Sequence, residues 1–180
     1  RLERVSKSLP KGYKKRKKRV ILPEDYWYDY QKKGRGISME LIDKIEAYWT
    51  GRAEGYSEVN QGELATDQKQ KWTENLRKHL PKGEPKNIKI LDVGTGPGFF
   101  AILLAEEGYQ VTAVDYTEEM LKEARKNAGA LAEQITWKQM DAQNLEFPDE
   151  TFDAVVSRNL TWNLEKPEKA YEEWMRVLKP

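Results

Sequence analysis

Residues 91–102 form the segment that most constrains how this chain folds. Their sequence, LDVGTGPGFFAI, begins with apolar residues typical of a strand and ends with apolar residues typical of a buried helix. Between these two parts, Gly94 and Gly96 allow a sharp turn and let a ligand approach the backbone closely. Gly98 opens the helix, whose first N–H groups and positive dipole end would face that ligand. The segment therefore predicts a strand–loop–helix unit with a ligand site at the loop.

The surrounding sequence alternates between strand-like and helix-like segments from residue 86 onward. We expect strands at 88–93, 110–115, 135–139 and 152–157, and helices at 98–107, 117–128 and 166–178. Strands that alternate with helices indicate βαβ units, hence a Rossmann-like α/β fold with a mostly parallel sheet and helices on both faces. Upstream, the pattern predicts helices at 39–50 and 64–80 with a loop at 51–64 between them.

Three parts of the chain follow from these patterns. We expect a basic, aromatic arm at 1–38, a helical cap segment at 39–84 and the α/β domain at 85–180. The strand at 152–157 would lie at an exposed edge of a four-stranded sheet, which would leave backbone groups unpaired. We therefore expect that the α/β domain is incomplete and truncated after the helix that follows its fourth strand.

The glycine loop could belong to one of three ligand-binding motifs. A nucleoside-triphosphate loop is excluded because the required Lys-Ser or Lys-Thr pair is missing. A dinucleotide loop needs a third small residue at position 99, which Phe99 occupies. The spacing D-x-G-x-G-x-G, with Asp92 two residues before Gly94, instead resembles motif I of class I S-adenosylmethionine-dependent methyltransferases. A plain turn is the alternative for the loop taken alone.

Two further motifs extend this resemblance. Asp115 ends the second expected strand, 21 residues after Gly94, where a carboxylate can accept hydrogen bonds from both ribose hydroxyls of an adenosine. The alternative role of Asp115 is that of an ordinary residue at a helix N-terminus. Asp141 and Ala142 follow the third strand, where the family places an acidic and a small residue along the adenine. The stretch around them resembles the ubiquinone/menaquinone-type methyltransferases, and the likeness covers about residues 48–180.

The resemblance implies the cofactor S-adenosyl-L-methionine, with S-adenosyl-L-homocysteine as product. The residues expected to bind it are Asp92, Gly94, Thr95, Gly96, Gly98, Asp115, Tyr116, Asp141, Ala142, Arg158, Tyr56 and Arg52. Among these, Arg52 and Tyr56 resemble an upstream segment that closes over the methionine end of the cofactor. An ordinary exposed loop is the alternative for that segment.

Residues after the fourth strand lie where open α/β sheets bind ligands. The family uses this segment near the transferred methyl group, so Asn159 and Trp162 are expected to contact the acceptor. A packing role is the alternative for Trp162. The motif Asn/Asp-Pro-Pro-Tyr, which the family uses to methylate amino groups of adenine or glutamine, is replaced by Ser-Arg-Asn-Leu at 157–160. That replacement weighs against adenine or glutamine N-methylation.

No catalytic residue is assigned. The sulfonium methyl group is already electrophilic, so its transfer requires no metal. A general base is required only if the nucleophile carries a proton. The chain has no cysteine, which excludes thiolate catalysis and cysteine-based zinc sites. Its single histidine, His79, lies at the end of an expected helix, where a surface or capping role is typical.

The arm differs in charge from the rest of the chain. Residues 1–38 hold 13 Lys and Arg against 4 Asp and Glu, including an unbroken basic run at 14–19 and four aromatic residues at 26–30. Such an arm can stay solvated, or can bind nucleic acid through phosphate neutralisation and base stacking. The acidic remainder of the chain argues against a broad nucleic-acid surface.

We therefore expect a methyltransferase that acts on a small-molecule acceptor. The alternatives are an RNA methyltransferase that uses the arm, and a non-catalytic module that binds the cofactor. No run of about 18 apolar residues suggests a membrane span. The lack of cysteine and of a secretory signal fits a cytoplasmic location. The sequence does not indicate an oligomeric state.

Overall fold

The sheet lies at the centre of the molecule and is parallel throughout. A computed structural model describes residues 20–21 and 39–180. In the described residues, the strands are β1 (Val20–Ile21), β2 (Lys89–Val93), β3 (Gln110–Asp115), β4 (Ile135–Gln139) and β5 (Ala154–Val156). Their spatial order is β1-β5-β2-β3-β4. The strand order therefore reverses at β2: β3 and β4 lie on one side of it and β5 on the other. The carboxyl end of β2 is thus a topological switch point.

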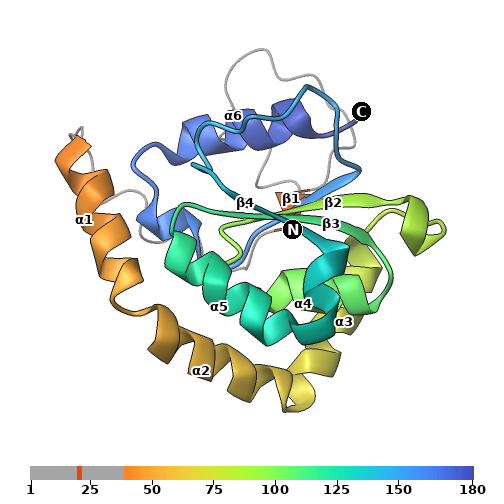
Figure 1. Ribbon diagram of the computed structural model, residues 1–180. Helices are drawn as coiled ribbons and strands as arrows, with labels where there is room; N and C mark the ends of the chain where they lie inside the picture. Colours follow the sequence, from red (N-terminus) through yellow and green to blue (C-terminus); the bar gives the residue numbers. More distant parts are fainter. Residues whose placement is uncertain (1–19, 22–38) are drawn as a thin grey trace.

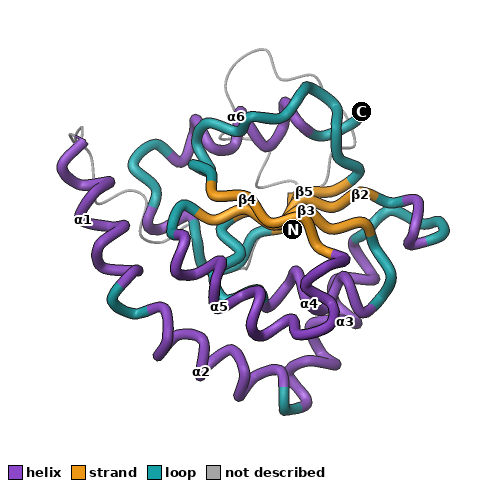
Figure 2. Tube along the Cα trace, in the orientation of Figure 1, coloured by secondary structure: helices purple, strands orange, loops and turns teal. Residues whose placement is uncertain are grey.

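Helices cover both faces of this sheet. They are α1 (Met39–Thr50), α2 (Ala53–Leu64), α3 (Asp67–His79), α4 (Phe99–Glu106), α5 (Glu118–Ala128) and α6 (Pro167–Val177). Short 3₁₀ turns occupy Pro85–Asn87, Gly129–Gln134 and Thr161–Asn163. Figures 1 and 2 show α6 on one face and α3, α4 and α5 on the other, with α1 and α2 along the outer side of α5. The predicted Rossmann-like arrangement is confirmed.

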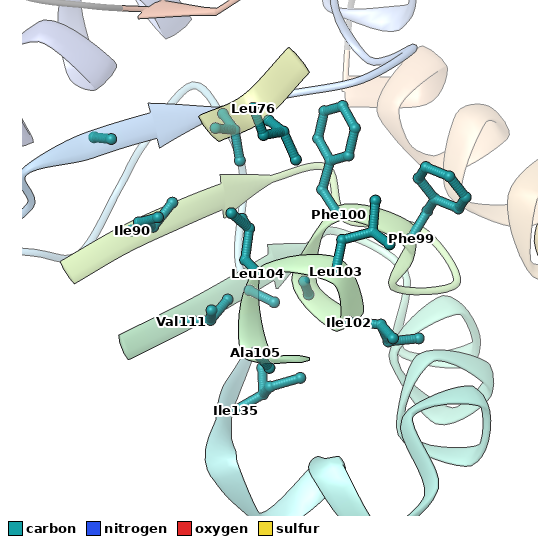
Figure 3. Close-up of a cluster of buried hydrophobic side chains, with 14 of the residues drawn as sticks. Leu76, Ile90, Phe99, Phe100, Ile102, Leu103, Leu104, Ala105, Val111 and Ile135 are labelled. Atoms are coloured by element: carbon teal, nitrogen blue, oxygen red, sulfur yellow. The ribbon is translucent and has the colours of Figure 1, made fainter. Parts of the chain in front are cut away.

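Two apolar clusters hold these layers together, one on each face of the sheet. Helix α4 belongs to the first, in which it packs on Ile90 and Val111 of the sheet and on Leu76 of α3 (Figure 3). Its residues 99–105 are all buried, which explains why the sequence of this helix is apolar around its whole circumference. The second cluster is centred on Trp174 of α6, whose Nε1 donates to the carbonyl of Ala142 at 3.0 Å.

The prediction of a loop at 51–64 is wrong, because residues 53–64 of this segment form α2. The helix carries two glycines and no clear apolar stripe, so its sequence lacks the usual helical signal. Polar contacts with α5 replace that stripe. Asn127 of α5 donates to Ser57 Oγ at 2.9 Å, and Gln61 Nε2 donates to Asn127 Oδ1 at 2.7 Å. Helix α3 then begins at Asp67 rather than at 64, because Thr66 caps it by accepting from the N–H of Gln68 at 3.4 Å.

The strand expected at 152–157 corresponds to β5, and two of its residues have a neighbouring strand on each side. Val20 pairs with Val155 and Ile21 with Val156, so β1 covers part of the edge of β5 opposite β2. The expectation of a fully exposed edge is therefore wrong at these positions. The basic run and the aromatic cluster of the arm lie outside the described residues. None of the described helices combines the length and the apolar character needed to cross a membrane.

Candidate functional site

A pocket opens at the carboxyl edge of the sheet, beside the switch point. The glycine loop at 94–97 contributes to it, and residues 115–117 and 140–143 follow β3 and β4 along the same pocket. Helix α1, Tyr56 and Asn60 of α2, and the segment at 158–165 line it as well, together with Asp92, Phe99, Phe100 and Met120. The structure therefore brings together most of the predicted binding residues, although they come from segments far apart in the sequence.

The glycines of the loop are required by both backbone and neighbours. Gly94, Gly96 and Gly98 have φ values of +66°, +53° and +91°, which other residues rarely adopt. A Cβ at Gly94 would lie 2.7 Å from Cδ2 of Leu160, and one at Gly96 would lie 3.5 Å from the ring of Tyr56. Leu160 and Tyr56 thus lie directly against the loop, and the pocket is narrow at this point.

The backbone N–H groups of the loop already have acceptors within the protein. The pairs, at 2.8–3.0 Å, are Gly94 and Thr95 with the Val114 carbonyl, Gly96 with Asp115 Oδ2, and Gly98 with the Thr95 carbonyl. Position 97 is a proline and has no N–H. Phosphate-binding loops instead direct free N–H groups at the ligand. This loop is therefore not arranged to hold the pyrophosphate of a dinucleotide.

Asp92 lies beneath the loop, near the amino end of α4. Its side chain is buried, and Thr95 Oγ1 donates to its Oδ2 at 2.7 Å. Burial raises the pKa of Asp92 to about 7, while the Thr95 hydroxyl and the N–H of Ala101 act in the opposite direction. An internal carboxylate thus occupies the positive end of α4, where a phosphate-binding loop would place its anion.

Asp115 ends β3 and holds the loop from the other side. Its Oδ2 accepts from the N–H of Gly96 at 2.8 Å and its Oδ1 from the N–H of Thr117 at 3.0 Å. Burial raises the pKa of Asp115, and these two backbone donors oppose the rise. Each carboxylate oxygen retains a second lone pair, so this oriented group can also accept from two hydroxyls of a ligand. Tyr116 lines the pocket next to it.

The wall after β4 is set by a chain of hydrogen bonds. Asp141 Oδ1 accepts from the backbone N–H and from Nε2 of Gln143, at 2.8 and 3.2 Å. Gln143 Oε1 in turn accepts from the N–H of Lys166 at 2.6 Å, which ties this wall to the start of α6. Sequence reasoning found Asp141 and Ala142 but missed Gln143, because no motif marks a residue whose role is to orient its neighbour.

Helix α2 contributes Tyr56 and Asn60, one helical turn apart, to the same pocket. Asn159 Nδ2 donates to the Tyr56 hydroxyl at 3.4 Å, and Asn60 Nδ2 donates to the Tyr56 carbonyl at 3.2 Å. Asn60 is only 2% exposed, and its Oδ1 has no hydrogen-bond donor in the described part of the chain. Asn60 was missed because the sequence predicted a loop here.

Arg158 reaches the pocket wall, but its guanidinium is engaged elsewhere. It donates to both carboxylate oxygens of Glu63 in α2, at 2.7 and 2.9 Å, and lies over the ring of Phe99 at 4.4 Å. Three other predicted residues, Gly98, Arg52 and Trp162, do not line the pocket. Arg52 lies over the ring of Tyr48 at 5.3 Å, and Trp162 is 58% exposed, with its ring 6.1 Å from that of Trp49.

The fold and this pocket define a class I S-adenosylmethionine-dependent methyltransferase. Three features agree with that class. They are the order of the strands, a glycine loop with no free N–H group for a phosphate, and acidic residues at the ends of three strands. Residues 91–180 match the family model of the methyltransferase domain, and the chain belongs to this family. Its cofactor is S-adenosyl-L-methionine, as the sequence predicted.

Curated relatives support the predicted subgroup. The ubiquinone/menaquinone biosynthesis C-methyltransferase of Roseobacter denitrificans is 41% identical over 96 residues, which are 51% of this chain and 38% of that protein. A phosphatidylethanolamine N-methyltransferase of Cereibacter sphaeroides is 37% identical over 91 residues, 49% of this chain and 44% of the relative. The chain thus spans about two fifths of the length of these relatives.

A solved structure shows the same fold. The S-adenosyl-L-methionine-dependent methyltransferase of Methanococcus maripaludis superposes with a TM-score of 0.65 at 26% sequence identity. The match covers 72% of this chain and 59% of that protein. It extends beyond the family segment, because 72% of this chain is more than the half that residues 91–180 represent.

Proposed function

We propose that this chain transfers the methyl group of S-adenosyl-L-methionine to a small-molecule acceptor and releases S-adenosyl-L-homocysteine. The observation that carries the proposal is the pocket itself. It combines carboxylates at the ends of β2, β3 and β4 with a glycine loop whose N–H groups are already used. A nucleoside without phosphates fits such a site, and a nucleotide does not.

Different residues of the pocket can bind the different parts of this cofactor. We assign the ribose hydroxyls to Asp115, because its carboxylate is held by two backbone donors and keeps free lone pairs. We assign the adenine to the wall at 141–143, which Gln143 orients. The methionine end would then lie at the glycine loop under Tyr56, with Asn60 Oδ1 as an acceptor for its ammonium group.

Positioning is the main contribution that these residues can make. The bound cofactor supplies an electrophilic sulfonium methyl group. Leu160 and Tyr56 close over the loop and exclude water from its vicinity, and Asn159 fixes the Tyr56 hydroxyl. The acceptor would enter between α1 and the segment at 158–165, from which Asn159 can contact it.

The other predictions have less support. The RNA acceptor depends on the basic run at 14–19, which lies outside the described residues, and the acidic pocket would oppose a phosphate backbone. The parts at 1–38, 39–84 and 85–180, and a cytoplasmic location, stay predictions. A role for Arg52 and Trp162 in binding also stays a prediction, and in this structure both contact other aromatic side chains.

The proposed function is tested by methyl transfer from methyl-labelled cofactor in a cell extract. We expect label in the small-molecule fraction and none in the RNA fraction. The Asp115→Ala variant, added at the same concentration, should transfer much less. Label confined to RNA would support the alternative acceptor, and bound cofactor without any labelled product would indicate a non-catalytic module.

A further inference from the structure

Glu165 lines the pocket, and its carboxylate receives no hydrogen bond from the described residues. Its side chain is only 14% exposed. Its one ionic contact in the described part of the chain is with Lys166 Nζ at 3.7 Å, beyond hydrogen-bonding distance, and the Lys166 side chain is 58% exposed. Carboxylates covered to this degree normally accept several hydrogen bonds, because their desolvation is costly. The Glu165 carboxylate is therefore free to accept a hydrogen bond from a ligand in the pocket.

The other pocket carboxylates are already held by the protein. Asp92 accepts from Thr95, Asp115 from two backbone N–H groups, and Asp141 from Gln143. Asp92 lies near the end of β2, Asp115 ends β3 and Asp141 follows β4, along the part of the pocket assigned above to the cofactor. Glu165 lies instead after β5, on the segment that also carries Asn159 and Leu160. This position assigns Glu165 to the acceptor.

The charge of the pocket restricts what that acceptor can be. Among the described residues that line the pocket, Arg158 is the only one with a formal positive charge. Its guanidinium donates to both oxygens of Glu63, so it is not available to a ligand. A phosphate or carboxylate on the acceptor would therefore meet Glu165 without a compensating cation.

Aromatic rings also line the pocket. The rings of Trp49 and Tyr56 lie 5.5 Å apart, and both residues line the pocket. Trp162 extends this group outside the pocket through its contact with Trp49. Aromatic faces attract cations, most strongly where water is excluded. Rings together with an unsatisfied carboxylate favour a positively charged group over a neutral one.

We propose that the acceptor is an amine whose nitrogen binds to Glu165, an inference that rests on the proposed methyl transfer. The amine releases one proton to water, which frees the nitrogen lone pair, and a remaining N–H of the amine donates to the Glu165 carboxylate. That lone pair forms the new N–C bond while the S–C bond breaks and its electron pair stays on sulfur. The positive charge thus moves from sulfur to nitrogen, and the methylated ammonium product lies beside the Glu165 carboxylate.

Three probes of the same size test the inference by ligand-detected NMR titration. They are benzylamine, benzyl alcohol and benzoate, each added to the protein with and without saturating S-adenosylhomocysteine. We expect benzylamine to bind about tenfold more tightly than benzyl alcohol, with benzoate the weakest of the three. In E165Q the preference for benzylamine should fall to about twofold or less, while the Kd for S-adenosylhomocysteine is unchanged.

Glu168→Gln is the matched control, since Glu168 lies in the first turn of α6, is exposed and does not line the pocket. This variant should keep the full preference for benzylamine. Equal binding of benzylamine and benzyl alcohol to the unaltered protein would overturn the inference, as would an E165Q variant that keeps the preference. Failure of the unaltered protein to bind S-adenosylhomocysteine would instead contradict the proposed function.

Discussion

Arg158 and Glu63 form a bidentate ion pair that connects the carboxyl end of β5 to the last turn of α2. Both side chains are largely covered, with 18% and 28% of their surface exposed. The stack of the Arg158 guanidinium on Phe99 connects the pair to α4 as well. Since α2 also carries Tyr56 and Asn60, this ion pair holds part of the pocket wall against the sheet.

Replacement of Glu63 by Gln should therefore destabilise the protein. Arg158 would keep its charge but lose its ionic partner, and we expect the free energy of unfolding to fall by about 1–3 kcal/mol. Urea unfolding measures this change. Glu58→Gln, at an exposed position of the same helix, should stay within about 0.5 kcal/mol of the unaltered protein. Equal effects of the two substitutions would contradict a structural role for the ion pair.

Gly94→Ala should destabilise the loop for two separable reasons. The positive φ costs about 1–2 kcal/mol for alanine, and the added Cβ would clash with Leu160. A second substitution, Leu160→Ala, should recover the part due to the clash and leave the part due to φ, as a double-mutant cycle can show. Gly55→Ala is the control, since nothing lies within 4 Å of a Cβ at this position in α2.

That control should stabilise the protein by about 0.5–1 kcal/mol, because alanine favours the helix over glycine. A stable Gly94→Ala variant with unchanged unfolding would show that Leu160 does not lie against the loop.

The buried Asp92 predicts a dependence of stability on pH. Its folded pKa of about 7 lies above the ordinary value of 3.8, so the folded state holds a proton that the unfolded state releases between these values. The free energy of unfolding should therefore decrease as pH rises from about 4 to about 7 and level off above, by at most about 4 kcal/mol.

Urea unfolding of Asp92→Asn across this range checks the prediction, since the variant should show a smaller decrease, with the remainder due to Asp115, whose pKa burial also raises. Asp67→Asn is the comparison: Asp67 is exposed and Lys71 lowers its pKa, so the decrease should persist. A decrease of the same size in Asp92→Asn would assign it to other groups.

The sequence predicted the α/β part of the fold closely because its signals are local. The strands at 110–115 and 135–139 and the helix that ends at Ala128 agree with the structure. Each depends on an apolar pattern or a terminal residue that its own segment supplies. The glycine loop was equally accessible, because the positive φ values of its glycines are a property of the loop itself.

The parts that were missed depend on contacts between distant segments. Helix α2 is held through Ser57 and Gln61 by Asn127, about 70 residues further along the chain, and no local pattern marks such a contact. The engagement of Arg158 by Glu63 and the unsatisfied carboxylate of Glu165 are visible only once the elements are packed. For the same reason, Arg52 was expected at the pocket although the fold places it beside Tyr48.

Calorimetric titration with S-adenosylhomocysteine tests the central claim, the cofactor site at the ends of β2, β3 and β4, most directly. The unaltered chain should bind, and Asp115→Ala should bind about 5- to 150-fold more weakly, a loss of about 1–3 kcal/mol. Glu118→Gln, which lies outside the pocket, should bind as tightly as the unaltered chain. No binding at millimolar ligand, or equal binding by the Asp115 variant, would contradict the site described above.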